Sequence, residues 1–268
     1  MTPWTTGFLQ SNGIRIHFTR TGGDKPALVA LHGFSDDGLC WTPITQALEA
    51  DFDVIMLDAR GHGRSDDPES GYGYDAHAAD VAGAIGALKL NKPMVLGHSM
   101  GAVTALALAG LHPGLAGAII LEDPPPFWMP PAPVEQAPPA ALRNWIVDIK
   151  RLTREEMIAQ CRATSPSWPE GEFGPWADAK LRFSFNVIKL PGAPPNVTLR
   201  SLAAAITCPA LLIIADTTLG AITSSTQANE LKTLIPQLKI EQIGKAGHSI
   251  RRDQQARYIE ALRAFARR

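Results

Sequence analysis

A serine between two glycines is the first feature of the sequence that points to chemistry. The stretch GHSMG, residues 97–101, follows the apolar run KPMVL and precedes the small-residue run AVTALALAG. A G-x-S-x-G turn between a buried strand and a helix is so sharp that its serine backbone is strained and its hydroxyl is lifted above the sheet. Gly97 and Gly101 remove the side chains that would collide in this turn. Ser99 is therefore a candidate nucleophile.

A serine hydroxyl needs a general base, which comes late in the chain if the order is nucleophile, acid, histidine. His248 lies in the segment IGKAGHSIRRD and is the only histidine after His112. This segment follows the last apolar run and precedes the last helical pattern. We predict that His248 is the base for Ser99, rather than a histidine of a surface loop.

An oxyanion that forms on an attacked carbonyl needs hydrogen-bond donors. The helix that follows Ser99 presents unpaired backbone N–H groups at its N-terminus, among them that of Met100. These groups lie where an oxyanion would form. Met100 is therefore predicted to donate one hydrogen bond of an oxyanion hole.

Four motifs, taken in their order and spacing, resemble those of the α/β-hydrolase superfamily. They are HGF (32–34), DARGHGRSD (58–66), GHSMG (97–101) and GHS (247–249). The resemblance covers essentially the whole chain and implies that superfamily's fold, with His248 as the base. It also implies that Phe34, which follows the His-Gly pair, contributes the second oxyanion N–H. His32, Asp58 and His62 then have structural tasks.

The acid that would orient the histidine has three candidates. In most α/β hydrolases it follows the strand before the last, and the matching stretch here is IIADTTLG. Thr218 stands where that aspartate is expected, and Asp216 is the nearby carboxylate. One strand earlier, LEDPPP places Glu122 and Asp123 at a predicted strand end. Because parallel strands are about 4.8 Å apart, either loop could present a carboxylate to His248.

Two arguments favour Asp123 as the acid. It lies where a strand ends and prolines begin, so the chain is stiffly held, as an orienting group requires. Asp216 lies in a Thr-rich stretch, one or two residues short of the needed reach. Asp216 and Glu122 remain the alternatives.

Short apolar runs alternate with helical patterns along much of the chain. The apolar runs cover residues 27–31, 53–57, 93–97, 117–122, 210–215 and 238–243, and the helical patterns cover residues 41–50, 75–90, 100–112, 225–235 and 253–268. Fully buried parallel strands have this pattern, and the alternation predicts a mostly parallel, doubly wound α/β sheet. The segments GFLQ and IRIHFTR, with no helix between them, predict an antiparallel hairpin at one sheet edge.

The alternation stops between Glu122 and Pro209. This interval opens with DPPPFWMPPAPVEQAPP and contains Trp128, Trp145, Trp168 and Trp176, four of the six tryptophans. Proline at that density excludes continuous helix, whereas residues 140–164 have the pattern of one or two helices. A disordered linker would be poorer in aromatic residues. We predict an α/β-hydrolase core of residues 1–123 and 207–268, and a helical, Pro/Trp-rich cap of residues 124–206 between strands 6 and 7.

Composition excludes several classes of partner. The formal net charge is −1, with 25 Lys and Arg against 26 Asp and Glu spread along the chain, so no nucleic acid partner is expected. The chain has neither a signal-peptide pattern nor an apolar stretch of membrane-spanning length. Cys40, Cys161 and Cys208 lack zinc-site spacing and are expected to be reduced. We therefore expect a cytoplasmic protein with no membrane partner, no cofactor and no metal.

These features together predict a serine hydrolase that cleaves a carboxylic ester or lactone, a small-molecule substrate, through a Ser-His-Asp acyl-enzyme mechanism. One alternative is a C–C bond hydrolase of a diketone-type substrate, which shares the same residue set. Another is a small-molecule receptor that retains the triad. The aromatic residues of the cap suggest an apolar group on the ligand. Asp36 and Asp37, which follow the HGF motif (32–34), are expected to be solvated loop charges rather than substrate contacts.

Overall fold

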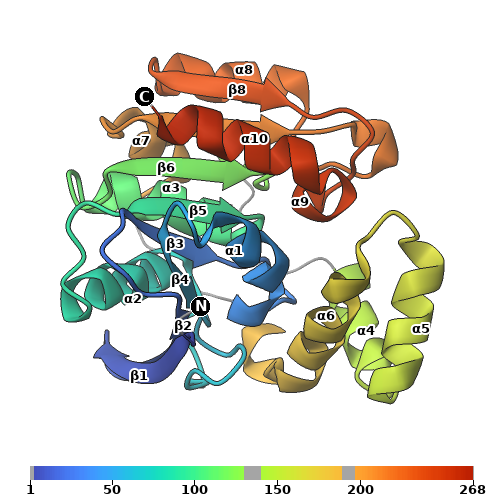
Figure 1. Ribbon diagram of the computed structural model, residues 1–268. Helices are drawn as coiled ribbons and strands as arrows, with labels where there is room; N and C mark the ends of the chain where they lie inside the picture. The colour runs from blue at the N-terminus through green and yellow to red at the C-terminus, as the bar shows by residue number, and fades with distance from the viewer. Residues whose placement is uncertain (1–2, 130–139, 189–196, 268) are drawn as a thin grey trace.

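The computed structural model describes residues 3–129, 140–188 and 197–267. Its centre is an eight-stranded sheet in the order β1-β2-β4-β3-β5-β6-β7-β8 (Figure 1). The strands are β1 (Thr5–Ser11), β2 (Ile14–Arg20), β3 (Ala27–Leu31), β4 (Asp53–Leu57), β5 (Met94–His98), β6 (Ala118–Glu122), β7 (Ala210–Ile214) and β8 (Leu238–Gln242). Pairing is antiparallel from β1 to β4 and parallel from β4 to β8. The mostly parallel α/β sheet is thus confirmed.

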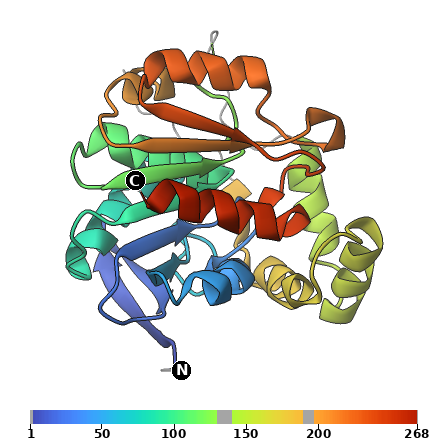
Figure 2. The same ribbon diagram turned by 45° about the horizontal axis from the view of Figure 1, so that its top comes forward.

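Helices cover both faces of this sheet (Figure 2). One face carries α1 (Thr42–Leu48), α9 (Ile250–Asp253) and α10 (Gln255–Ala266), and the other carries α2 (Tyr74–Ala87), α3 (Met100–Leu111), α7 (Leu199–Ala204) and α8 (Ser225–Leu234). Because both faces are covered, β4, β6 and β7 are buried at every position. Their unbroken apolar runs are the sequence signature of such strands.

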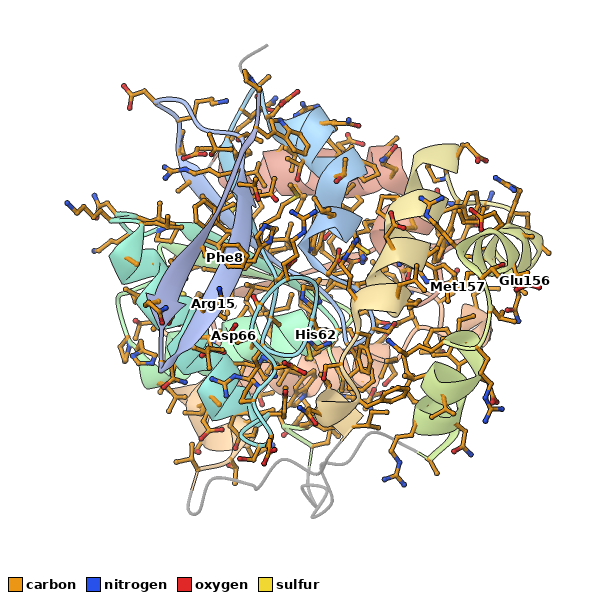
Figure 3. The ribbon with its side chains drawn as sticks, turned by 90° about the horizontal axis from the view of Figure 1, so that it is seen from below. Phe8, Arg15, His62, Asp66, Glu156 and Met157 are labelled. Atoms are coloured by element: carbon orange, nitrogen blue, oxygen red, sulfur yellow. The ribbon has the colours of Figure 1, made fainter. Side chains whose placement is uncertain are left out.

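The first sheet edge is the expected hairpin. Asn12 and Gly13 join β1 to β2 with positive φ at both residues, as a tight two-residue hairpin turn requires. The Arg15 guanidinium lies 5.3 Å from the ring centroid of Phe8 and 2.9 Å from the carboxylate of Asp66 (Figure 3). These contacts fasten the hairpin to the loop after β4.

A separate group of helices lies between β6 and β7, beside the carboxyl ends of the strands (Figure 1). It consists of α4 (Ala140–Ile149), α5 (Arg154–Thr164), α6 (Glu170–Arg182) and the 3-10 turn η2 (Phe185–Ile188). We refer to these four elements as the cap helices. They have a small core of their own, formed by Ile149, Met157, Cys161, Phe173, Trp176 and Ala177. Residues 140–164 form two helices, which begin separately because Thr153 and Glu156 build a capping box at the start of α5.

Some parts of the cap interval differ from the expectation. Helix α6 was not predicted, and it contains Pro175 in its interior. Trp128 packs in the main core, with its indole N–H donating to the carbonyl of Gln227 at 3.0 Å. Helix α7 also packs against the main core. The prolines at 130–139 lie outside the described residues, and the division at residues 123 and 207 stays a prediction.

Candidate active site

The carboxyl ends of four neighbouring strands meet at one edge of the sheet. In the register, Leu31 of β3 pairs with Gly97 of β5, His98 with Glu122 of β6, and Glu122 with Ile213 of β7. The loops that follow these strands are therefore adjacent, although they are far apart in the sequence. Ligand sites of parallel α/β sheets form at this edge.

Ser99 occupies a strained turn between β5 and α3. Its φ of 51° and ψ of −113° lie outside the common regions for a residue with a side chain, which costs about 1–3 kcal/mol. A Cβ on Gly97 would lie 2.1 Å from the Gly101 carbonyl oxygen, and one on Gly101 would lie 2.2 Å from that of Leu31. Ser99 is 7 % exposed. The sequence thus folds into the sharp elbow that the motif predicts.

His248, in the loop after β8, contacts Asp123. Its Nδ1 lies 2.7 Å from Asp123 Oδ2, and the backbone N–H groups of Ile222 and Thr223 donate to the two Asp123 oxygens at 2.8 Å each. Asp123 is fully buried and has a positive φ of 42°. A buried carboxylate accepts rather than donates, so Nδ1 carries the proton and Nε2 is left as a base.

The two alternative carboxylates have other partners. Asp216 accepts a hydrogen bond from the backbone N–H of Lys245 at 2.6 Å, which joins the loops after β7 and β8. Glu122 is fully buried and accepts from the backbone N–H of Arg251 at 3.0 Å and from Tyr258 Oη at 3.1 Å. Burial raises the pKa of Glu122, and Arg251 offsets only part of this rise. Within the described residues, neither carboxylate contacts His248.

His98 is a neighbour of the site that sequence reasoning missed. Its Nε2 donates to the carbonyl oxygen of His248 at 3.0 Å, and the two rings are 4.6 Å apart between centroids. Burial, with Arg251 and His248 nearby, holds the pKa of His98 well below its usual value, so the ring is neutral. His98 therefore fixes the backbone of His248. The apolar run of residues 93–97 ends just before His98, and nothing in the local sequence indicates its partner 150 residues later.

The backbone N–H groups of the two predicted oxyanion donors have no acceptor among the described residues. Neither Phe34 nor Met100 donates a backbone hydrogen bond within the described part of the chain. Met100 is the first residue of the twelve-residue helix α3, where N–H groups have no partner in their own helix. Both predicted oxyanion donors are thus available.

We refer to residues 33–36 as the oxyanion loop. Each of its first three carbonyl oxygens lies within hydrogen-bond distance of a polar group. Gly33 O accepts from the backbone N–H of Asp36 at 3.1 Å and from His32 Nδ1 at 2.8 Å. Phe34 O lies 2.6 Å from His62 Nε2, and Ser35 O accepts from Lys180 Nζ at 2.7 Å. His62 Nδ1 also lies 2.8 Å from the carbonyl oxygen of Arg60. Burial lowers the pKa of His62 to about 3, so its ring is neutral and donates to only one of these two carbonyls. His32, whose Nε2 accepts from the backbone N–H of Ala59, therefore donates through Nδ1 and braces the oxyanion loop.

Asp36 and Asp37 are not solvated loop charges, so that expectation was wrong. They are 4 % and 1 % exposed, because cationic side chains of the cap helices and of α9 cover them. Burial alone would raise the pKa of Asp36, but Arg252, Lys180 and Arg251 lower it well below its usual value. Asp37 Oδ2 lies 2.5 Å from Arg182. These partners are distant in sequence, and no local pattern reveals them.

Apolar residues of the cap helices lie against the oxyanion loop. The Phe183 ring lies 5.4 Å from that of Phe34 and 5.1 Å from that of His62, between centroids. Figure 3 labels His62 between the hairpin and the cap helices. Ile146 and Val187 belong to the same cluster. The cap therefore contributes an apolar wall beside one oxyanion donor.

Other chemistries have less support in the described residues. No group of three or more His, Cys, Asp or Glu side chains in the ranges 3–129, 140–188 and 197–267 could hold a metal ion. Cys40, Cys161 and Cys208 are free thiols. No described helix has the length and apolarity to cross a membrane.

Comparisons with known proteins agree with this geometry. A family model described as the alpha/beta hydrolase family matches residues 28–261. An N-formylmaleamate deformylase from Pseudomonas putida (strain KT2440) is 30% identical over 247 residues, which is 91% of this chain and 90% of that protein.

Two solved structures have similar folds. The N-formylmaleamic acid deformylase from Pseudomonas putida S16 has a TM-score of 0.81 at 24% identity and covers 96% of this chain and 100% of its own. An E-2-(acetamidomethylene)succinate hydrolase has a TM-score of 0.81 at 19% identity, and the match covers 99% of this chain and 100% of that one. Hydrolysis is the reaction class that the family and these names share. The chain belongs to the alpha/beta hydrolase family.

Proposed function

We propose that this hydrolase cleaves a carboxylic ester or lactone through an acyl-enzyme on Ser99. The observation that carries the proposal is the 2.7 Å contact between His248 Nδ1 and the buried carboxylate of Asp123, beside the strained turn of Ser99. A buried acid that holds Nδ1–H fixes the imidazole tautomer and stabilises the imidazolium that forms during catalysis. Nε2 is then the atom that accepts the Ser99 proton.

The reaction follows two acyl transfers. Ser99 Oγ attacks the carbonyl carbon while His248 Nε2 takes the hydroxyl proton, and the oxyanion accepts hydrogen bonds from Phe34 N and Met100 N. The tetrahedral intermediate collapses, and His248 gives its proton to the leaving alcohol. A water molecule then attacks the acyl carbon while His248 takes one of its protons. The bond to Ser99 Oγ breaks, His248 returns the proton to Oγ, and the carboxylic acid is released.

A second candidate is removal of a formyl group from nitrogen. It is supported by the relative named N-formylmaleamate deformylase, which is 30% identical over 91% of this chain. The same residues would serve, with His248 protonating a leaving nitrogen in place of an alcohol. An amine is a poorer leaving group than an alcohol, so protonation by His248 would contribute more to this reaction.

The test compares the wild type with Ser99→Ala on three substrates: an activated aryl ester, a simple lactone and an N-formyl amide. The wild type should release a burst of phenol from the ester and then turn over steadily, whereas Ser99→Ala should lose about 10⁴-fold or more in kcat with an unchanged circular dichroism spectrum. The ratio of kcat/KM values for the ester, lactone and formamide decides between the two candidates.

Active-site labelling provides a second readout. A fluorophosphonate should modify Ser99, as mapped by mass spectrometry of the digested protein. Retained turnover in Ser99→Ala, or a label on another residue, would contradict the nucleophile assignment. A single slow turnover without a steady rate would indicate a receptor that retains the residue set.

A further inference from the structure

Helix α6 of the cap presents ionisable side chains to the core. Glu172, Trp176 and Lys180 are spaced four residues apart and therefore lie on one face of the helix. Glu172 and Lys180 are fully buried, and the Lys180 ammonium lies 4.7 Å from the centroid of the Trp176 ring. A buried ammonium is costly unless it is paired and hydrogen-bonded, so its partners indicate what the structure gains from it.

The partners of Lys180 belong to the oxyanion loop. Lys180 Nζ donates to the Ser35 carbonyl oxygen at 2.7 Å and lies 3.0 Å from Asp36 Oδ1. It comes from the cap, whereas the other donors to this loop come from the core. The cap thus supplies one of the hydrogen bonds that determine the conformation of the loop.

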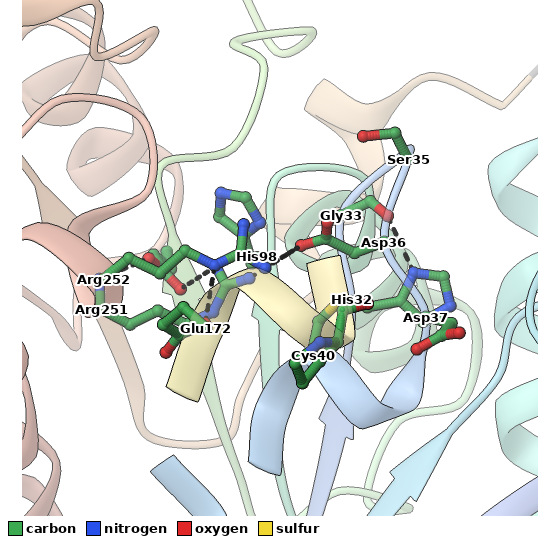
Figure 4. Close-up of polar contacts among 12 residues, drawn as sticks. His32, Gly33, Ser35, Asp36, Asp37, Cys40, His98, Glu172, Arg251 and Arg252 are labelled. Carbon is green, nitrogen blue, oxygen red and sulfur yellow. Dashed lines mark hydrogen bonds and ion pairs between the residues drawn. The ribbon is translucent and has the colours of Figure 1, made fainter. Parts of the chain in front are cut away.

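The same aspartate connects the oxyanion loop to the segment after His248. Asp36 Oδ2 accepts hydrogen bonds from the Nη2 atoms of Arg251 and Arg252, each at 2.9 Å (Figure 4). Arg252 Nε in turn donates to Glu172 Oε2 at 3.0 Å. Helix α6 therefore contacts two elements of the proposed site at once, the oxyanion loop directly and the His248 segment through Arg252.

The charges within this group balance. Its anions are Asp36, Glu122 and Glu172, and its cations are Lys180, Arg251 and Arg252. Removal of Lys180 would leave Asp36 with two of its three cations and the Ser35 carbonyl without this donor. Lys180 has no hydrogen bond to Ser99, His248 or Asp123 among the described residues, so we expect such a change to act on the loop rather than on the side chains of the proposed triad.

We propose that Lys180 is a positioning residue for the oxyanion hole: docking of cap helix α6 on the core holds the loop 33–36 in the conformation in which the Phe34 N–H can donate a hydrogen bond to the oxyanion. This inference rests on the proposed function, which assigns that N–H to the reaction. Lys180 does not touch the reacting atoms and acts through the Ser35 carbonyl and Asp36.

The experiment compares Lys180→Met with the wild type in the full-length chain. Loss of an oxyanion donor costs about 10²–10³-fold in kcat, and a displaced donor should cost about 10- to 100-fold. KM for an ester substrate should change less than about threefold, because the oxyanion forms only in the transition state. Affinity for a trifluoromethyl ketone, which forms a tetrahedral adduct on the serine, should fall in parallel with kcat. The midpoint of the pH profile of kcat/KM should not move, because His248 and Asp123 keep their contact.

Arg154→Met is the matched control, because it breaks an ion pair that lies wholly within the cap. Arg154 is 41% exposed and lies 2.6 Å from Asp178, away from the oxyanion loop. This variant should keep wild-type kcat and ketone affinity. An equal loss of kcat in Arg154→Met and Lys180→Met would assign the effect to general weakening of the cap and overturn the proposal.

Lys180→Arg carries the test if Lys180→Met does not fold. Arginine retains the positive charge beside Asp36. Its larger, planar guanidinium cannot place donors in the position from which the Lys180 ammonium reaches both the Ser35 carbonyl and Asp36. We expect a kcat about three- to tenfold below the wild type with the same kcat-selective signature. Wild-type kcat and ketone affinity in a folded Lys180 variant would overturn the inference. Activity that persists in Ser99→Ala would instead contradict the proposed function.

Discussion

Two neighbouring loops each carry an aspartate within their first two residues, and the two side chains have different surroundings. Asp123, after β6, is fully buried and receives hydrogen bonds from two backbone N–H groups and the His248 imidazole. Asp216, after β7, is only partly buried and receives one from the backbone of Lys245. The two N–H donors to Asp123, Ile222 and Thr223, belong to the same loop as Asp216. In this chain, the loop after β7 therefore supports the acid candidate instead of supplying it.

Glu122 and Asp36 extend the comparison to other buried carboxylates. Glu122 is adjacent to Asp123 in sequence but accepts from Arg251 and Tyr258. Asp36 is held by three cations. A carboxylate can be buried when its oxygens accept hydrogen bonds, and the kind of donor determines what the carboxylate does in the structure. The backbone N–H groups hold the Asp123 carboxylate in an orientation in which it also contacts His248. Asp36 instead forms ion pairs with cations from separate segments and so connects those segments.

The largest effect is expected for Asp123→Asn. An amide keeps the shape but favours the wrong imidazole tautomer, so kcat on an ester should fall by about 10⁴-fold. Steady-state kinetics, with circular dichroism to verify the fold, measures this loss. A near-normal kcat in Asp123→Asn combined with a large loss in Asp216→Asn would reverse the comparison and move the acid to the loop after β7.

The next largest effect is expected for Asp36→Asn, and it concerns stability. Removing one partner of a buried ion cluster costs about 3–5 kcal/mol, because Arg251, Arg252 and Lys180 lose a shared anion. Urea denaturation at pH 7 should show this loss in the free energy of unfolding. A variant as stable as the wild type would mean that the cations find other compensation and that Asp36 does not join the cap to the core.

The pH dependence of stability gives a second measure of Asp36. The surrounding cations hold its folded-state pKa well below its usual value, so its contribution is present above the unfolded-state pKa of about 3.9. That contribution is lost as the pH falls from about 5 through the lower folded-state pKa. The free energy of unfolding of Asp36→Asn should therefore fall less steeply than that of the wild type below about pH 5. Parallel curves for the two proteins would contradict the depressed pKa.

A smaller effect is expected for Glu122→Gln. Burial raises the pKa of this carboxyl, so ionisation in the folded state already carries a cost that the amide avoids. The amide keeps one oxygen that can accept from the backbone N–H of Arg251, and its NH2 can donate to Tyr258 Oη, so we expect a loss of about 1–2 kcal/mol in the free energy of unfolding. The kcat should fall by less than tenfold. A loss of kcat as large as that of Asp123→Asn would show that Glu122 is as important for the reaction as Asp123.

Local patterns predict what depends on a few neighbouring residues. The runs ALVAL and DVIML form β3 and β4 at the expected bounds, and GHSMG forms the strained turn, because each is determined by burial or by close glycine contacts. The sequence favours Asp123 over Asp216 through the stiffness of the chain after β6 and the short reach of Asp216. The backbone donors Ile222 and Thr223, which hold the Asp123 carboxylate, are revealed by no spacing.

Other features depend on partners that are far apart in the sequence. Lys180 lies 145 residues after Ser35, and only the docking of α6 on the core brings them together. In the sequence, Asp36 and Asp37 resemble solvated loop charges, because their partners Lys180 and Arg182 belong to the distant helix α6. Pro175 argues against a helix locally, yet α6 forms around it and its carbonyl accepts a weak hydrogen bond from Cys40 Sγ at 3.6 Å. Tertiary packing outweighs the local preference in each case.

Asp216→Asn should have the smallest effect and completes the comparison with Asp123. The amide retains an oxygen that can accept from the backbone N–H of Lys245, so the bridge between the loops after β7 and β8 is weakened rather than lost. The free energy of unfolding should fall by less than about 1 kcal/mol, and kcat should stay within about twofold of the wild type. The same ester assay and urea denaturation measure both quantities. Because this loop also carries the donors Ile222 and Thr223, a kcat loss without a shift in stability would show that Asp216 acts on the reaction through the support of Asp123.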